Sequence, residues 1–267
     1  MMDRIKVVLD ELNQSKPQGQ MNMRLRVLED DDYKSGVSDQ ASTVLADAFH
    51  SYGAFDWLAE VEPDPDKVDT MKKRLVKYAV AVGECLLRSS GGFTLVAERV
   101  DNDGSTSLVG ALHSWPETDR KSGFLDSLKS AFRDIRVLFR VGLPPATSTW
   151  KSTRLLLNRM SACFIFETKR EEAMIGHPEP YWYLCKIGVS SNAQGCGIGR
   201  RIMQAHTRIA DALDMDIYLE TETEQLMKFY EKCGFNVLIE YKVECKGSAP
   251  LEPIWGMRRI KHALNQT

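Results

Sequence analysis

Three alternate glycines mark the stretch Gln194-Gly195-Cys196-Gly197-Ile198-Gly199-Arg200. The segment before it, Tyr181 to Val189, is almost continuously apolar with Lys186 as its one charge, which predicts a central strand covered on both faces. The segment after it, Ile198 to Leu213, repeats apolar residues at helical spacing. The glycines are therefore predicted to form a turn that joins a buried strand to an amphipathic helix.

Such a turn suits a phosphate or pyrophosphate group. Glycine lets the backbone approach a ligand closely, and the first turn of a helix offers unpaired N–H groups with partial positive charge. Arg200 would add a formal charge. The dinucleotide fingerprint GxGxxG is not met, because the third glycine comes one residue early, and the GK[ST] of the Walker pattern is missing. Tight packing of the turn remains the alternative reading.

The patterns along the rest of the chain predict a mixed α/β domain. Strands are expected at 23–27, 93–100, 108–115, 217–221, 235–243 and 254–259, and helices at 38–49, 68–86 and 224–232, with two more between 122 and 172. The turn composition of Asp101 to Gly104 favours an antiparallel hairpin. We expect one domain over 23–267 with helical insertions. It is preceded by a mobile or loosely docked N-terminal extension, 1–22, which has one short helical pattern and a polar second half.

Composition excludes several classes of protein. With 267 residues, 43% hydrophobic and 27% charged, the chain has the profile of a globular protein with a substantial core. Its formal net charge of -2 argues against a nucleic-acid partner. No run of about 18 apolar residues and no apolar leader occur, so we expect no membrane partner and a cytoplasmic location. The six cysteines form neither a CxxC pair nor a Cys/His cluster, so we expect reduced thiols and no metal.

The segment from His177 to Arg259 resembles the GNAT superfamily of acyl-CoA-dependent N-acetyltransferases. The family signature Q/R-x-x-G-x-G/A is matched by the residues 194–199, between a strand and a helix as the family requires. The second signature is matched by Phe229-Tyr230-Glu231-Lys232-Cys233-Gly234-Phe235. The segments Trp182-Tyr183-Leu184 and Trp255-Gly256-Met257 look like the small-molecule branch that includes puromycin N-acetyltransferase.

This resemblance implies a mostly antiparallel sheet flanked by helices, with a central splayed pair of parallel strands and a cofactor-binding core at 177–260. It also implies acetyl-CoA as co-substrate and direct attack of an amine on the thioester in a ternary complex. The implied cofactor contacts are Ile187, Gly188, Val189, Gln194, Gly195, Cys196, Gly197, Ile198, Gly199 and Arg200. One backbone amide near Val189 would polarise the thioester carbonyl, and Gly188 would permit the bulge that splays the strand.

One catalytic role follows from the same resemblance, and a second follows from the chemistry that an ammonium acceptor needs. Tyr230 is the expected general acid for the departing thiolate, although a packed aromatic is the structural alternative. Glu220, at the end of a central strand, is the expected base for the ammonium, with His113 and His177 as rivals. Where many family members carry an asparagine, seven residues before the tyrosine, this chain has Thr223.

The expected function is acetyl transfer to a primary amine of a small molecule, by a monomer or homodimer. Two alternatives stay open. The first is a protein or peptide N-acetyltransferase, in which the helices within 122–172 frame a groove. The second is a non-catalytic acyl-CoA-binding sensor, which the departure at Thr223 keeps in view.

Overall fold

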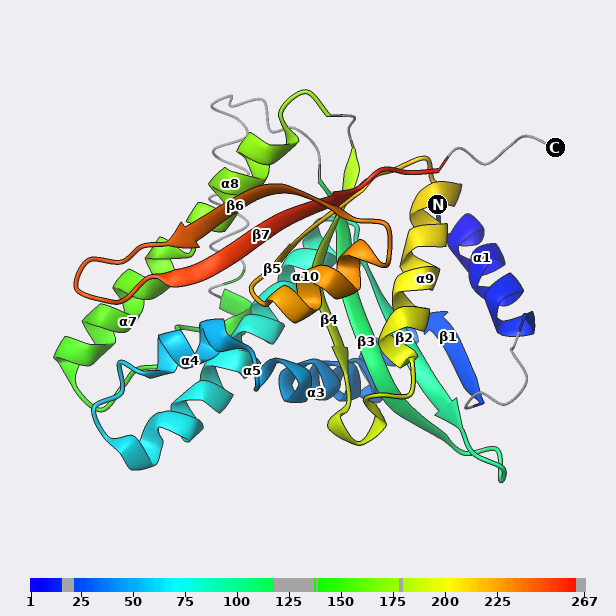
Figure 1. Ribbon diagram of the computed structural model, residues 1–267. Coiled ribbons are helices and arrows are strands. Elements are labelled where there is room, and N and C mark those ends of the chain that lie inside the picture. The colour runs from blue at the N-terminus through cyan, green and yellow to red at the C-terminus, as the bar shows by residue number, and fades with distance from the viewer. Residues whose placement is uncertain (16–21, 118–136, 138, 178–179, 263–267) are drawn as a thin grey trace.

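A seven-stranded sheet forms the centre of the protein (Figure 1). The computed structural model describes residues 1–15, 22–117, 137, 139–177 and 180–262. The strands are β1 (Met23–Val27), β2 (Phe93–Val100), β3 (Thr106–Glu117), β4 (Tyr181–Val189), β5 (Ile217–Thr221), β6 (Asn236–Val243) and β7 (Leu251–Arg259). They lie in the order β1-β2-β3-β4-β5-β7-β6, and β4 with β5 is the parallel pair. The predicted mixed, mostly antiparallel sheet is confirmed.

Helices cover both faces of this sheet. They are α1 (Met2–Gln14), α2 (Asp30–Ser35), α3 (Val37–Phe49), α4 (Gly53–Ala59), α5 (Pro65–Ser89), α7 (Trp150–Ala162), α8 (Ile165–Met174), α9 (Ile198–Ala212) and α10 (Glu224–Glu231). One core cluster joins α1 and α9 to one face, and a second joins α3, α4, α5 and α7 to the other. None of the described helices has the length and apolar character that a membrane span needs.

The parallel strands β4 and β5 separate soon after they meet. Only Trp182 with Ile217 and Tyr183 with Tyr218 are paired, whereas β4 continues to Val189. The expected splayed pair is therefore present. Beyond Tyr183, the edge of β4 that faces β5 has no strand partner there, which leaves backbone donors and acceptors for another group.

The bulge in β4 does not lie where we expected it. Gly188 is in regular register with Ala111, and the register shift against β3 leaves Cys185 as the extra residue. The reason for a glycine at 188 is packing instead. A Cβ there would lie 2.6 Å from the Cβ of Ala48, so the absence of a side chain lets α3 approach the strand. The expectation that Gly188 makes the bulge was wrong.

The N-terminal segment packs more firmly than a mobile or loosely docked extension. The helical pattern expected within 1–22 forms α1, which packs on the sheet and on α9, with Ile5, Leu9 and Leu12 buried. The Asn13 side chain exchanges two hydrogen bonds of 2.9 Å with the backbone of Leu25 and so covers part of the edge of β1. The described part of the extension is thus a docked helix.

The insertion between 122 and 172 is only partly described. The first of the two helices predicted there falls mainly on residues outside the described ranges. The region after Gly142 holds two helices, α7 and α8, which are divided at Cys163 and Phe164. The apolar periodicity continues across this break, so a sequence pattern alone merges the two.

Candidate active site

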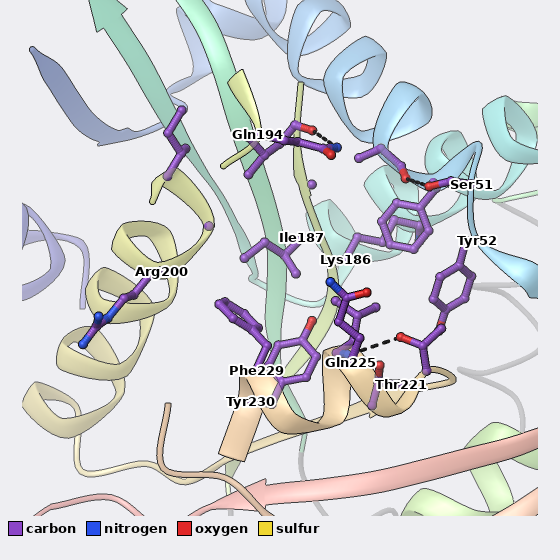
Figure 2. A pocket seen from close by; sticks show the side chains of 18 of the residues that line it. Ser51, Tyr52, Lys186, Ile187, Gln194, Arg200, Thr221, Gln225, Phe229 and Tyr230 are labelled. Carbon is purple, nitrogen blue, oxygen red and sulfur yellow. Dashed lines mark hydrogen bonds between the residues drawn. The ribbon is translucent and has the colours of Figure 1, made fainter. Parts of the chain in front are cut away.

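A cavity of about 600 Å³ occupies the opening between β4 and β5 (Figure 2). Its walls come from the turn between α3 and α4, the second half of β4, the glycine turn with the start of α9, the end of β5, and α10. The lining residues are Ala48, Phe49, Ser51, Tyr52, Leu184, Cys185, Lys186, Ile187, Gly188, Val189, Ala193, Gln194, Gly195, Gly197, Ile198, Gly199, Arg200, Glu220, Thr221, Thr223, Gln225, Leu226, Phe229 and Tyr230. Every sequence-predicted site residue lines it except Cys196.

The glycine turn presents bare backbone to this cavity. Gly195 and Gly197 both have a φ of +78°, a left-handed conformation that favours glycine. A Cβ built on either would meet no atom within 4 Å, so tight packing does not explain these two glycines. Gly197 caps α9, whose first amides have no acceptor within the helix. The turn therefore fits a phosphate group through backbone N–H donors.

Two polar side chains flank the turn in different ways. The Gln194 amide donates to the carbonyl of Val189 at 3.2 Å, which ties the turn to the end of β4. Arg200 is exposed and points away from the centre of the cavity (Figure 2). It also borders a neighbouring groove of about 470 Å³ with Arg201 and Lys232. Arg200 is thus placed for long-range attraction of an anion at the rim.

Residues Ile187, Gly188 and Val189 combine a core role with an exposed backbone edge. The side chains of Ile187 and Val189 pack against the α9 core cluster. Their backbone borders the cavity because β5 has separated from β4 at this level. The structural and the ligand-binding readings of this strand are therefore compatible.

Tyr230 is both a packed aromatic and a cavity residue. Its side chain is 5% exposed and lies edge-on to Phe235 and Phe229, with ring centroids 5.8 and 5.3 Å away. The hydroxyl points into the cavity on the side of Ile187 (Figure 2). Burial raises the pKa of Tyr230 well above its usual value, so the phenol keeps its proton at neutral pH. A buried, protonated phenol suits a proton donor.

Glu220 lines the same cavity at the end of β5. Burial is the main cause that raises the pKa of its carboxyl to about 7, and the charge of Arg170 acts in the opposite direction. Its Oε1 atom is buried and has no hydrogen-bond partner among the described residues. A carboxyl group with a pKa near 7 is well matched to proton transfer at neutral pH.

The two rival histidines do not line the cavity. His113 is 1% exposed, and burial, with the nearby charge of Lys186, lowers its pKa to about 3. The Nδ1 atom of His177 lies 2.7 Å from a guanidinium nitrogen of Arg258, which also pairs with Asp216. Both histidines belong to the surrounding structure.

The sequence patterns missed one wall of the cavity. Phe49 ends α3, and Ser51 and Tyr52 lie in the turn before α4, where no short motif marks them. Phe49, Tyr52 and Phe55 contact one another with ring centroids 5.3 to 6.4 Å apart. Three aromatics within seven residues were the available signal, but an aromatic cluster reads equally well as core.

The position of Thr223 has a structural explanation. Its hydroxyl accepts the backbone N–H of Leu226 at 3.2 Å and caps the start of α10. Two residues later, the Gln225 amide is directed into the cavity beside Tyr230 (Figure 2). The amide side chain on this wall is therefore Gln225. The described residues contain no group of three or more His, Cys, Asp or Glu side chains that could hold a metal ion.

Comparison with known proteins relates part of the chain to a family and its fold to solved structures. Residues 160–237 match the model of the acetyltransferase (GNAT) domain. The solved structure of the Drosophila melanogaster polyamine N-acetyltransferase, which catalyses the formation of N-acetylagmatine, is 13% identical with a TM-score of 0.50 and covers 88% of this chain and 97% of that chain. A yellow fever mosquito protein assigned as arylalkylamine N-acetyltransferase 7 is 12% identical with a TM-score of 0.51, covering 88% and 86%. These likenesses show a common fold. Residues 160–237 therefore match an acetyltransferase (GNAT) domain, and the chain shares its fold with N-acetyltransferases.

Proposed function

We propose that the protein transfers the acetyl group of acetyl-CoA to a primary amine of a small molecule, by direct attack in a ternary complex. One observation carries the proposal: the glycine turn, the open edge of β4, Glu220 and Tyr230 all border a single cavity. The proposal places the chain in the small-molecule branch to which the WYL and WGM segments are similar. The two solved structures named above carry amine acetyltransferase names, which agrees with this substrate class.

The residues divide the chemistry among them. The amides of the glycine turn and the start of α9 hold the pyrophosphate of the co-substrate, and the backbone of 187–189 pairs with its pantetheine arm. Glu220, as carboxylate, takes a proton from the acceptor ammonium. The C–N bond then forms as the C–S bond breaks, the nitrogen releases its second proton to solvent, and a backbone amide near Val189 stabilises the carbonyl oxygen. Tyr230 donates its proton to the departing thiolate.

The proposal includes the setting of the enzyme. We propose a cytoplasmic protein that acts as a monomer or homodimer and needs no metal, nucleic acid or membrane. The net charge of -2 and the absence of a long apolar run in the sequence support this setting. Sedimentation of the purified protein tests the oligomeric state, and turnover in the presence of a chelator tests the independence from metal.

A thiol-release assay tests the function directly. The protein is mixed with acetyl-CoA and a panel that includes 2-phenylethylamine, agmatine and short peptides, and free CoA thiol is followed against a control without amine. Amine-dependent thiol release is the expected result. Release with peptides alone would favour a peptide acetyltransferase. Tight CoA binding without any release would favour a non-catalytic sensor.

A further inference from the structure

Glu222 is a buried carboxyl group that the proposed chemistry does not use. It follows β5 directly and is 8% exposed. Both of its carboxyl oxygens accept the backbone N–H of Ala54, at 3.1 and 2.9 Å, across 168 positions of sequence. A Cβ on Gly53 would lie 3.2 Å from Oε1, so a glycine at this position lets the carboxyl group approach. Glu222 thus joins the end of β5 to the start of α4.

This contact links two neighbouring walls of the cavity. On one side, the segment that follows β5 contributes Thr221 and Thr223 to the lining and leads into α10. On the other side, Ser51 and Tyr52 lie two to three residues before Ala54, whose amide Glu222 holds. In Figure 2, Tyr52 lies on the opposite side of the cavity from Arg200, which follows the glycine turn.

Capping of a helix does not require a group from so far away. The N-cap residue of α4 is Tyr52, whose side chain makes no capping hydrogen bond and instead lines the cavity. A serine or aspartate at that position would cap the helix locally. Lys72 influences Glu222 through space but pairs directly with Asp56, and the described residues give Glu222 no ion pair of its own. A buried carboxyl group without a cation is costly, so its retention points to a role beyond stability.

We propose that Glu222 is a positioning residue for the acceptor: it holds the amide of Ala54 against the end of β5 and thereby fixes Ser51 and Tyr52 on the acceptor side of the cavity. This inference rests on the proposed function, since it assigns the wall with Tyr52 to the acceptor and the glycine turn to the co-substrate. Loss of the carboxyl group then affects acceptor binding more than co-substrate binding.

The test compares Glu222→Ala, Glu222→Gln and the control Glu62→Ala. Glu62 is also buried, and it also accepts backbone N–H groups, from Ser148 at 2.9 Å and Asp64 at 3.3 Å, but it does not line the cavity. KM is measured for acetyl-CoA and for whichever of 2-phenylethylamine and agmatine is turned over faster. Amide hydrogen exchange over residues 49–56 is measured in parallel.

For Glu222→Ala we expect KM of the amine to rise about tenfold and KM of acetyl-CoA to stay within about twofold, as the loss of a charge-assisted hydrogen bond implies. Exchange over residues 49–56 should accelerate by a similar factor. Glu222→Gln keeps one oxygen acceptor, so its KM for the amine and its exchange rate over residues 49–56 should lie close to those of the unsubstituted protein. Glu62→Ala should change neither this KM nor this exchange rate.

Equal changes in both KM values, or unchanged exchange in a folded Glu222→Ala protein, would overturn the positioning role. The exchange measurement needs no turnover, so it separates the two proposals. If neither amine releases thiol from the unsubstituted protein, the proposed function fails. Accelerated exchange in Glu222→Ala would then still support the link between the two walls, and unchanged exchange would remove it.

Discussion

At the scale of single residues, Tyr230 shows that a core role and a chemical role can belong to one side chain. Its ring packs between aromatic neighbours, while its hydroxyl points into the cavity. The rigid packing of the ring fixes the position of the hydroxyl, which is what a proton donor needs. The choice between a packed aromatic and a general acid is therefore not exclusive.

Removal of this hydroxyl tests its role. Tyr230→Phe should lower kcat by about 100-fold, because the thiolate loses its proton donor, and should leave the Kd of CoA within about twofold. The matched control is Tyr241→Phe, which removes a buried hydroxyl without a hydrogen-bond partner in the described structure and away from the cavity lining. Normal turnover by Tyr230→Phe would contradict the assignment.

Glu220 should be visible in the pH dependence. The pKa of this carboxyl is about 7, so the carboxylate that accepts a proton is present above pH 7 and disappears below it. We expect kcat/KM to fall with decreasing pH below about 7, by roughly tenfold per unit, and Glu220→Gln to abolish that limb of the profile. Glu224→Gln, which alters an exposed carboxylate paired with Lys228, should keep the profile intact.

At the scale of elements, the glycines of this site serve different purposes. Gly188 allows α3 to approach β4, whereas Gly199, near the start of α9, has its nearest neighbour 3.7 Å from a built Cβ. The absence of a side chain at Gly188 therefore serves packing inside the protein. Its absence at Gly199 leaves room for a ligand beside the backbone.

Two alanine substitutions separate these purposes. Gly188→Ala should lower the free energy of unfolding by about 1 to 3 kcal/mol, because α3 must move away from the strand. Gly199→Ala should leave that free energy unchanged or slightly higher, since alanine favours the helix, yet weaken CoA binding. Urea unfolding and calorimetric titration with CoA measure the two effects. An equal loss in the free energy of unfolding for both variants would contradict the assignment of Gly188 to packing and Gly199 to ligand binding.

The docking of α1 is a second property of an element. Leu9 is 3% exposed and lies in the core that joins α1, α9 and the sheet, whereas Val7 on the same helix is 57% exposed. Leu9→Ala should therefore lower the free energy of unfolding by about 2 to 5 kcal/mol, and Val7→Ala should change it little. Equal, small effects in urea unfolding would mean that α1 is loosely held after all.

At the scale of the whole molecule, buried titratable groups set the pH dependence of stability. The pKa values of Glu220 and Glu222 are raised to about 7, so the folded state holds their protons more tightly than the unfolded state, and they lower stability as pH rises from about 4.5 to 7. Burial lowers the pKa values of His113 and His206 to about 3, so the contribution of these two side chains to stability increases as pH rises from about 3 to 6.5. The two effects oppose each other over most of this range.

A double variant isolates the contribution of the carboxyl groups. The double variant Glu220→Gln, Glu222→Gln removes the cost of burying two charges. The difference between its free energy of unfolding and that of the unsubstituted protein should therefore increase as pH rises from 4.5 to 7. The gain should reach on the order of 3 kcal/mol, if each carboxyl contributes part of its pKa difference. Urea unfolding at half-unit pH intervals measures it. A constant difference across this range would show that the two groups titrate normally.

Local chemistry determined much of what the sequence alone predicts. The strands at 93–100, 181–189 and 217–221 and the turn Asp101 to Gly104 were predicted closely, because alternation, apolar runs and turn residues act over a few neighbours. The glycine turn was likewise placed before α9, since left-handed backbone and helix starts have local signals. The glycine turn also carried part of the family resemblance.

Only the tertiary structure decided how distant segments meet. The bulge at Cys185, the close approach of α3 to Gly188, the docking of α1, and the link between Glu222 and Ala54 all depend on partners far away in the chain. The wall with Ser51 and Tyr52 belongs to the same group, since its residues reach the cavity only after α3 packs on β4. Backbone preferences are local and can be read from a few residues, whereas packing and burial are set by the whole fold, which no short pattern encodes.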